Sequence, residues 1–311
     1  MKFFDYSVAD APAADELRAG LLATPAVIAP KHFYDALGSR LFEAICELPE
    51  YTLPRDERAI FDRHTADIAH AVGPGCTLVD LGAGNCEKAE RLFAALQPVQ
   101  YVAVDIAGDF LRTRLVALGE RHPDIEMIGI VQDFTAALQL PPEVQERRRV
   151  LFYPGSSIGN FGPHAAVEFL RRVHRAADGG HLLLGADLVK DAAGLVAAYD
   201  DALGVTAAFN LNVLLVVNRL AGTDFVVADW KHVALVNAAD SRIEMHLEAR
   251  RALTVCWPGG ERRFAAGERI HTENSYKTTL PALEALLQSA GFTQVTLYTD
   301  PAQRFALALA S

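Results

Sequence analysis

The chain lacks long apolar runs and has few cysteines. None of its apolar stretches approaches the roughly 20 residues that a helix needs to span a bilayer, and residues 1–5 include an early acidic residue where a secretory leader would be apolar or basic. The four cysteines are scattered, without a Cys-x-x-Cys pair or partnering histidines. This spacing indicates neither a metal site nor a disulfide framework. We therefore expect a protein of the reducing cytoplasm, without metal and without a membrane-embedded segment.

Positive charge is also scarce. Lysine and arginine together number 29 against 39 acidic residues, which gives a net charge of −10. Broad nucleic-acid binding needs a basic face to neutralise phosphates, so this balance argues against a nucleic-acid partner. The 311 residues are 51% hydrophobic, enough to fill a sizeable core. We expect a small-molecule substrate and either one large domain or two closely associated ones.

A glycine turn after an apolar run is the most informative feature. In residues 78–88 an apolar segment ends in Gly82-x-Gly84 and a helical pattern follows. Glycine permits positive φ and close approach of a ligand, and the N–H groups of the next helix start favour an anionic group. A second apolar run, at 101–104, ends at Asp105, whose carboxylate could accept both hydroxyls of a ribose. Together these features suggest a nucleoside cofactor.

A missing glycine narrows the choice of cofactor. A dinucleotide-binding loop would carry a third glycine at position 87, where this sequence has Glu87, and a pyrophosphate would meet that carboxylate. The Asp-x-Gly-x-Gly pattern that begins at Asp80 instead resembles the first motif of class I methyltransferases, which use S-adenosylmethionine. Gly-x-Gly alone is a weak signal, and Asp105 alone could be a turn residue. Their joint spacing within a strand–helix–strand frame favours S-adenosylmethionine.

Strand-like and helix-like segments alternate through most of the chain. We expect strands at 77–81, 101–105, 127–131, 149–153, 181–186, 294–299 and 304–309, and helices at 87–96, 108–120 and 164–177. This alternation is typical of an α/β fold with a doubly wound, mostly parallel sheet. The last two strands read as a hairpin, as in the seven-stranded Rossmann-like methyltransferase sheet, whose last strand is reversed.

The alternation breaks between residues 187 and 277. A helical segment at 191–203 and an apolar helical run at 209–219 precede β-like segments at 223–257. We therefore predict a second, α+β lobe that binds substrate. The expected division gives 56–190 and 278–311 to the cofactor-binding domain. It gives 1–55 and 191–277 to the substrate-binding lobe.

Several segments resemble one family, the L-histidine Nα-methyltransferases of ergothioneine biosynthesis. The matching segments are residues 33–42, 48–51, 80–88, 155–160, 198–201 and 272–275. They span nearly the whole chain in the expected order, so the combination is more specific than any one segment. The resemblance implies an enzyme that uses S-adenosylmethionine to convert L-histidine through mono- and dimethyl forms to Nα-trimethylhistidine (hercynine). It also implies a monomer.

The resemblance implies roles for the cofactor residues. These residues are Gly82, Gly84, Lys88, Asp105, Asp133 and Phe134. Lys88 suits the methionine carboxylate, Asp105 the ribose hydroxyls, and Asp133 with the next residue the adenine ring. Without the family match, Lys88 could lie on a solvated helix face and Asp133 could cap a helix.

The resemblance also implies a set of substrate-binding residues. These are Tyr34, Tyr51, Gly155, Asn160, Tyr199, Met245, Glu273 and Ser275. Asn160 and Tyr199 resemble the pair that binds the substrate carboxylate, and Met245 matches a pocket position. Tyr51 is expected near the imidazole. Glu273 and Ser275 are two residues apart, so an extended backbone points both to one face, where they could hold the imidazole.

These residues could instead have purely structural roles. Asn160 could be a turn residue, Met245 and the tyrosines could pack in the core, and Glu273 could be an exposed carboxylate of a β-hairpin.

The expected reaction is an in-line displacement in which the substrate amine attacks the sulfonium methyl. Positioning supplies most of the acceleration. Tyr34, directly or through water, is the candidate to orient the amine and pass protons, and Asn160 is the second candidate catalytic residue. Two other functions stay open at this point: methylation of another aromatic amino-acid amine, of thiohistidine or tryptophan type, and a non-catalytic paralogue that only binds the cofactor. Glu273 and Ser275 favour an imidazole over an indole but do not distinguish histidine from a ring-modified histidine.

Overall fold

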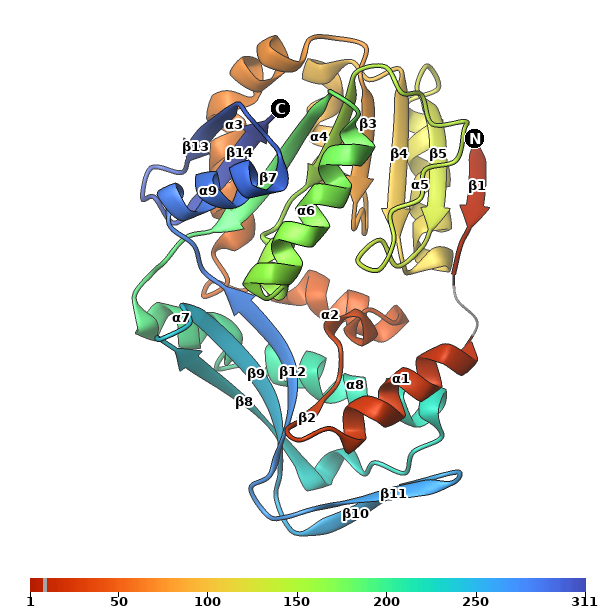
Figure 1. Cartoon of the computed structure of the whole chain (residues 1–311), viewed down its shortest axis with the longest axis vertical. Helices are drawn as coiled ribbons and strands as arrows, with labels where there is room; N and C mark the ends of the chain where they lie inside the picture. The colour runs from red at the N-terminus through yellow and green to blue at the C-terminus, as the bar shows by residue number, and fades with distance from the viewer. Residues whose placement is uncertain (8–9) are drawn as a thin grey trace. The chain divides into compact units, whose positions relative to one another are not determined.

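The computed structural model describes residues 1–7 and 10–311, and the chain divides into two compact units (Figure 1). Unit 1 consists of Met1–Ser7, Leu53–Val189 and Lys277–Ser311. Unit 2 consists of Lys190–Tyr276 and the described part of Val8–Thr52. Each unit contains its own sheet and its own helices.

Unit 1 is built on an eight-stranded sheet with the order β1-β5-β4-β3-β6-β7-β14-β13. Its strands are β1 (Lys2–Asp5), β3 (Thr77–Leu81), β4 (Gln100–Asp105), β5 (Glu126–Val131), β6 (Arg149–Tyr153), β7 (His181–Asp187), β13 (Val295–Thr299) and β14 (Phe305–Ala310). All pairs from β1 to β7 are parallel, whereas β14 is antiparallel to both β7 and β13. The inner strands are buried along their length, as expected for a parallel sheet with both faces covered. The predicted doubly wound sheet and its terminal hairpin are confirmed.

Helices cover both faces of this sheet. They are α3 (Leu53–Val72), α4 (Glu87–Leu96), α5 (Gly108–Arg121), α6 (Pro163–Ala177) and α9 (Leu280–Ala290), with a short 3-10 helix, η2 (Ser157–Asn160). Helices α6 and α9 pack together over one face, where Phe169 and Leu287 join a core with Leu184. On the other face, α3 places Phe61 edge-on against Phe152, with ring centroids 6.0 Å apart. Helix α4 places Phe93 edge-on against Tyr101 of β4, with centroids 5.1 Å apart, and α5 lies against β4 and β5.

The first residues of the chain differ from the prediction. We expected seven strands and assigned residues 1–55 to the substrate lobe, but Lys2–Asp5 pairs with β5 as an eighth strand, and unit 1 resumes at Leu53. Phe3 fits over Gly129, where a β-carbon would lie 2.5 Å from its ring, and Phe4 packs against the core of the opposite face. A four-residue strand is too short for its alternation to stand out in the sequence.

Unit 2 combines a four-stranded sheet of order β2-β12-β9-β8, a two-stranded hairpin and a group of helices. The strands are β2 (Ala26–Val27), β8 (Trp230–Asn237), β9 (Arg242–Ala249), β10 (Leu253–Trp257), β11 (Gly260–Phe264) and β12 (Arg269–Tyr276). The helices are α1 (Asp10–Leu22), α2 (Ala36–Cys46), α7 (Ala192–Tyr199) and α8 (Val205–Ala221), with 3-10 helices η1 (Pro30–Phe33) and η3 (Val227–Asp229). Helix α8 contacts α1, α2, β8 and β9, so it forms the centre of this unit.

Within residues 1–7 and 10–311, no helix is both long and apolar enough to cross a membrane.

Candidate active site

The predicted cofactor residues follow the carboxyl ends of four neighbouring parallel strands of unit 1. Strands β5, β4, β3 and β6 are consecutive in the sheet, and the first three are seen side by side in Figure 1. Asp105 ends β4, and Gly82, Asp133 and Gly155 follow the ends of β3, β5 and β6. Ligands of open α/β sheets bind outside the carboxyl ends of the strands. The fold therefore brings these residues to one edge of the sheet.

The glycine loop is held to the end of β4 by Asp105. Gly82 and Gly84 have φ values of +74° and +52°, which side chains rarely adopt. The Gly84 N–H donates to Asp105 Oδ2 at 2.8 Å, and the Ala107 N–H donates to Asp105 Oδ1 at 2.9 Å. A carboxylate offers about four acceptor sites, so Asp105 can still accept ribose hydroxyls while it holds the loop.

At the start of α4, Asn85 and Cys86 have structural roles. Asn85 Oδ1 accepts from the Glu87 N–H at 3.2 Å and so satisfies a donor in the first turn of the helix. Cys86 adopts the left-handed conformation, with φ of 64°, and its side chain is buried. Burial raises the pKa of the Cys86 thiol to about 12. A thiol in this state is a small apolar group, not a nucleophile.

Asp80, the acidic residue at the start of the glycine motif, is a buried carboxyl beside this loop. It is 2% exposed, and its Oδ2 accepts from the hydroxyl of Tyr101 at 2.7 Å. Its Oδ1 is buried and has no hydrogen-bond partner among the described residues. Burial raises the pKa of Asp80 to about 7. An unsatisfied buried carboxyl oxygen at this place is unusual and fits a polar group of a bound ligand.

Lys88 is paired with a carboxylate that the sequence did not single out. Lys88 Nζ lies 2.6 Å from Glu57 Oε2, and Glu57 Oε1 accepts from the Gly155 N–H at 2.8 Å. The sequence does carry a signal for Glu57, because it occupies a position on the apolar face of α3, between Leu53 and Ile60. An acidic residue in such a stripe is unusual unless it has a buried partner.

Asp133 stabilises a turn in the segment that follows β5. Its Oδ1 accepts from the Thr135 N–H at 3.1 Å and from the Thr135 hydroxyl, which makes a turn and not a helix N-cap. The Phe134 ring meets Tyr153 edge-on, with centroids 5.8 Å apart. A β-carbon on Gly82 would lie 3.6 Å from the Phe134 ring. A side chain at position 82 would therefore lie against this aromatic ring.

The tyrosines of the predicted substrate site lie together in unit 2. The Tyr51 and Tyr199 rings meet edge-on, with centroids 6.1 Å apart. The Tyr199 hydroxyl donates to Ser275 Oγ at 2.8 Å. Burial, and then the nearby Tyr199, Cys46, Tyr34 and Glu273, raise the pKa of Tyr51 well above its ordinary value. The Tyr51 phenol therefore stays protonated and able to donate a hydrogen bond.

A β-bulge in β12 decides which side chains face this group of tyrosines. The register between β12 and β9 shifts between His271 and Glu273, so that Glu273 lies opposite Met245. The Thr272 hydroxyl donates to the Met245 carbonyl at 2.9 Å. Glu273 and Ser275 are both buried, as is Met245 across the ladder, so they share the inner face. Strict alternation from the buried Ile270 would instead have turned Glu273 outward.

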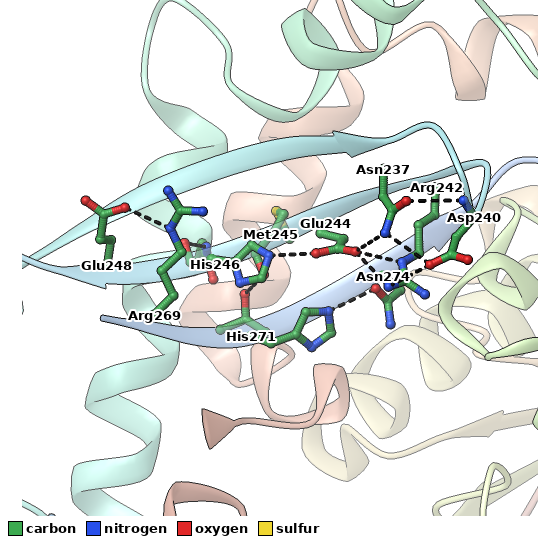
Figure 2. Close-up of polar contacts among 12 residues, drawn as sticks. Asn237, Asp240, Arg242, Glu244, Met245, His246, Glu248, Arg269, His271 and Asn274 are labelled. Atoms are coloured by element: carbon green, nitrogen blue, oxygen red, sulfur yellow. Dashed lines mark hydrogen bonds and ion pairs between the residues drawn. The ribbon is translucent and has the colours of Figure 1, made fainter. Parts of the chain in front are cut away.

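The opposite face of the same strands is polar (Figure 2). Arg242 donates to Glu244 at 2.8 Å, and His246 lies 2.9 Å from the second oxygen of Glu244. His271 contacts Asn274 at 2.9 Å. In the described parts of the chain, no group of three or more histidine, cysteine or acidic side chains is arranged to hold a metal ion. The Glu244 network therefore stabilises the outer face of the sheet.

Tyr199 is also held through its backbone, by residues that the sequence reasoning missed. His232 Nε2 lies 2.7 Å from the Tyr199 carbonyl, and His232 Nδ1 lies 2.8 Å from the Asn210 amide nitrogen. The same amide nitrogen donates to the His246 carbonyl at 3.1 Å, which fixes it as the donor. His232 is therefore neutral with its proton on Nε2, and burial lowers its pKa accordingly.

The predicted substrate residues divide between the units. Those of unit 2 are Tyr34, Tyr51, Tyr199, Met245, Glu273 and Ser275. Gly155 and Asn160 belong to unit 1, on the segment that follows β6. Ser156, in the same segment, accepts from the Asp187 N–H at 2.8 Å and so ties it to β7. Each unit thus collects its own set of candidate residues.

The sheet of unit 1, its reversed last strand and the glycine loop at its carboxyl edge define a Rossmann-like methyltransferase that uses S-adenosylmethionine. Residues 13–311 match the family described as histidine-specific, S-adenosylmethionine-dependent methyltransferases, and the chain belongs to that family. It is therefore an enzyme, and S-adenosylmethionine is its cofactor.

Curated relatives agree with this assignment. The chain is 43% identical to the histidine N-alpha-methyltransferase of Mycolicibacterium smegmatis, over 95% of this chain and 93% of the relative. It is 40% identical to the protein of the same name from Mycobacterium tuberculosis, over 95% and 94%. Ergothioneine biosynthesis protein 1 of Neurospora crassa is 30% identical over 86% of this chain, which corresponds to 31% of that longer protein.

Among solved structures, a protein of Pyrococcus horikoshii OT3 shares the fold. The TM-score is 0.50 and the sequence identity 13%, over 89% of this chain and 99% of that one.

Proposed function

We propose that the protein transfers three methyl groups, one at a time, to the α-amine of L-histidine and forms Nα-trimethylhistidine, the first step of ergothioneine biosynthesis. The observation that carries this proposal is the buried group of Tyr51, Tyr199, Glu273 and Ser275 in unit 2. The carboxylate of such a group can accept a hydrogen bond from one imidazole nitrogen, and a neutral hydroxyl can bond the other nitrogen. An indole has one N–H and would leave part of such a site unsatisfied.

The residues at the edge of the unit 1 sheet fit the cofactor. When bound, S-adenosylmethionine supplies a methyl group that is activated by the positive charge on sulfur. The Lys88 ammonium would hold its carboxylate, and Asp105 would accept its ribose hydroxyls. Asp133 would accept from the adenine amine, with Phe134 against the ring. Gly82 and Gly84 carry no side chain, so a ligand can approach the backbone at these two positions.

For the substrate carboxylate, Tyr199 and Asn160 supply neutral donors. In the present structure the Tyr199 hydroxyl donates to Ser275. A hydroxyl can rotate, so Ser275 can instead donate to Tyr199 when the Tyr199 proton turns toward a carboxylate. Tyr199 would then hold the carboxylate of histidine, and Ser275 would hold the ring of the same histidine molecule. We propose that Gly155 and Met245 complete the binding site.

The amine must lose a proton before each transfer, because only the lone pair attacks the methyl carbon. Tyr34 is the group we assign to orient the amine and to pass its proton, directly or through water. Its ring is held edge-on against Phe42 and Phe209, at centroid distances of 5.7 and 5.8 Å. After three transfers no lone pair remains, so the reaction ends at the trimethyl product.

A substrate panel tests the choice of histidine. L-Histidine, a thiolated histidine and L-tryptophan are compared as methyl acceptors for the wild type and for Glu273→Ala. We expect histidine to be preferred, and the variant to lose activity on the imidazole substrates alone. Preference for a thiolated histidine or for tryptophan would favour methylation of another aromatic amine, and binding of S-adenosylmethionine with no methylation of any amine would favour a non-catalytic paralogue.

We also propose that the enzyme is a cytoplasmic monomer without a nucleic-acid partner. The four cysteines all carry free thiols, which supports a reducing compartment. The net charge of −10 supports the absence of a nucleic-acid partner. Size-exclusion chromatography with light scattering tests the oligomeric state.

A further inference from the structure

We propose that Glu57 is a positioning residue for the amino-acid end of the cofactor, held in place by the Gly155 amide and acting through Lys88. This inference rests on the proposed role of Lys88 in binding the methionine carboxylate. It adds a residue from α3 that neither the glycine loop nor the resemblance to known methyltransferases points to.

The two oxygens of Glu57 have separate partners. Oε2 accepts from Lys88 Nζ at 2.6 Å, and Oε1 accepts from the Gly155 N–H at 2.8 Å. Gly155 has a φ of +73°, and a β-carbon there would lie 3.0 Å from Lys88 Nζ. One carboxylate thus links three segments at the carboxyl edge of the sheet: α3, α4 and the turn after β6.

The structure is shaped to admit this carboxylate. Glu57 is 2% exposed. A β-carbon on Gly185, in β7, would lie 2.7 Å from Glu57 Oε1 and 3.0 Å from the Gly155 nitrogen. A larger residue at 185 would therefore displace Glu57. A buried carboxylate is stable only with a charged partner and satisfied hydrogen bonds, and here Lys88 and Gly155 provide both.

The exposed fraction of the two partners shows which of them faces a ligand. The Lys88 side chain is 40% exposed, whereas the Glu57 side chain is 2% exposed. An ammonium has three N–H donors, so Lys88 can bond Glu57 and still bind a carboxylate. Glu57 holds a long flexible side chain in one orientation before the ligand arrives, which lowers the entropy lost on binding.

Two ligands separate this role from a merely structural one. S-Adenosylhomocysteine carries the amino-acid end, and 5′-methylthioadenosine lacks it. Calorimetry on Glu57→Gln should show about tenfold weaker binding of S-adenosylhomocysteine, equivalent to about 1.4 kcal/mol. Binding of 5′-methylthioadenosine should change by less than about twofold, because it makes no contact with Lys88.

The neighbouring residue provides a matched control. Asp56 is also a buried carboxylate of α3, and it pairs with Arg304, with Nε 3.0 Å from Oδ2. Asp56→Asn should lower the melting temperature and leave the ratio of the two affinities unchanged. Equal loss for both ligands in Glu57→Gln, no loss, or tighter binding of S-adenosylhomocysteine would each overturn the proposal.

A double-mutant cycle tests whether Glu57 acts through Lys88. In the background of Lys88→Gln, Glu57→Gln should cause no further selective loss. An additive effect would overturn the proposal. If Glu57→Gln does not fold, Glu57→Asp decides the question, since its shorter side chain keeps the charge but cannot reach both partners; it should show the same selectivity. None of these binding measurements needs histidine, so they remain decisive if the enzyme proves to methylate another amine.

Discussion

Single buried side chains give the enzyme a characteristic pH dependence, and Asp80 is the clearest case. Burial raises its pKa to about 7 from the ordinary value of 3.8. Between these two values the folded protein holds a proton that the unfolded chain has released. The folded state is therefore favoured at the acidic end of this window, and stability from this group is lost as the pH rises through about 7.

Replacing Asp80 by asparagine removes this titration. The variant keeps an acceptor for the Tyr101 hydroxyl and never becomes charged. We expect the wild type to lose about 1–4 kcal/mol of unfolding free energy relative to Asp80→Asn as the pH rises from about 4 to 8. Urea unfolding of both proteins at several pH values measures the difference. A difference that does not change with pH would contradict a neutral Asp80 in the folded state.

Tyr199 gives a prediction on substrate binding. Tyr199→Phe removes the hydroxyl that we assign to the substrate carboxylate, and we expect the KM for histidine to rise about tenfold, since a hydrogen bond to a charged group contributes about 1.5–3 kcal/mol. Tyr276→Phe is the matched control, because Tyr276 lies on β12 and contacts Arg242. Steady-state kinetics with saturating cofactor give both values. Similar KM values for the two variants would refute the assignment.

At the residue scale, the sequence was sufficient to predict the site residues that belong to short motifs. The glycine loop and Asp105 could be placed because they lie close together in the chain and follow apolar strands. Glu57 could not be assigned, because its partners Lys88 and Gly155 are distant in sequence and only the fold brings them together. The same holds for Asn210 and His232, which support Tyr199 from α8 and β8.

In unit 2, the turn between α7 and α8 positions the substrate residue Tyr199. Tyr199 is the last residue of α7, and Asp201 lies in the short connection to α8. Asp201 Oδ1 accepts from the Thr206 N–H at 2.7 Å and Oδ2 accepts from the Val205 N–H at 3.0 Å. Two unpaired donors of the α8 N-terminus are satisfied in this way. The carboxylate thus fixes the turn that follows Tyr199.

Loss of this cap should destabilise the protein. We expect Asp201→Ala to lower the free energy of unfolding by about 1–2 kcal/mol, since it leaves two helix N–H groups unpaired. The adjacent, exposed Asp200 is the control, and Asp200→Ala should change stability by less than about 0.5 kcal/mol. Circular dichroism during urea unfolding measures both. Equal effects of the two substitutions would contradict the capping role.

At the element scale, the strands and helices of the sheet could be predicted, whereas the bulge could not. Glu273 and Ser275 are two residues apart, so their common face followed from the alternation alone. Which face they share depends on the register shift between His271 and Glu273. A bulge leaves no sequence pattern of its own here, because Thr272 is an ordinary strand residue.

For the whole molecule, the chain order is interrupted twice. Unit 1 is assembled from three segments, one of which is the first seven residues. Apolar alternation predicted the large segments of this unit, but the pairing of β1 with β5 joins residues more than a hundred positions apart. Such long-range pairing depends on the available edge of a finished sheet and not on local sequence.

Cofactor binding should stabilise the whole protein against heat. At a concentration of S-adenosylhomocysteine about 100 times its Kd, linkage predicts about 2.7 kcal/mol of added stability. We expect the rise in melting temperature to shrink in Asp105→Ala, which loses the acceptor for the ribose hydroxyls and the bond to the Gly84 N–H. Thermal unfolding with and without ligand compares the two proteins. An undiminished rise in the variant would show that Asp105 does not hold the cofactor.

The most direct test of the central claim is mass spectrometry of a reaction between the purified protein, S-adenosylmethionine and L-histidine. The account predicts transient mono- and dimethylhistidine, then trimethylhistidine, with one S-adenosylhomocysteine released for each methyl group. Unchanged histidine in the presence of an enzyme that binds S-adenosylmethionine would contradict it.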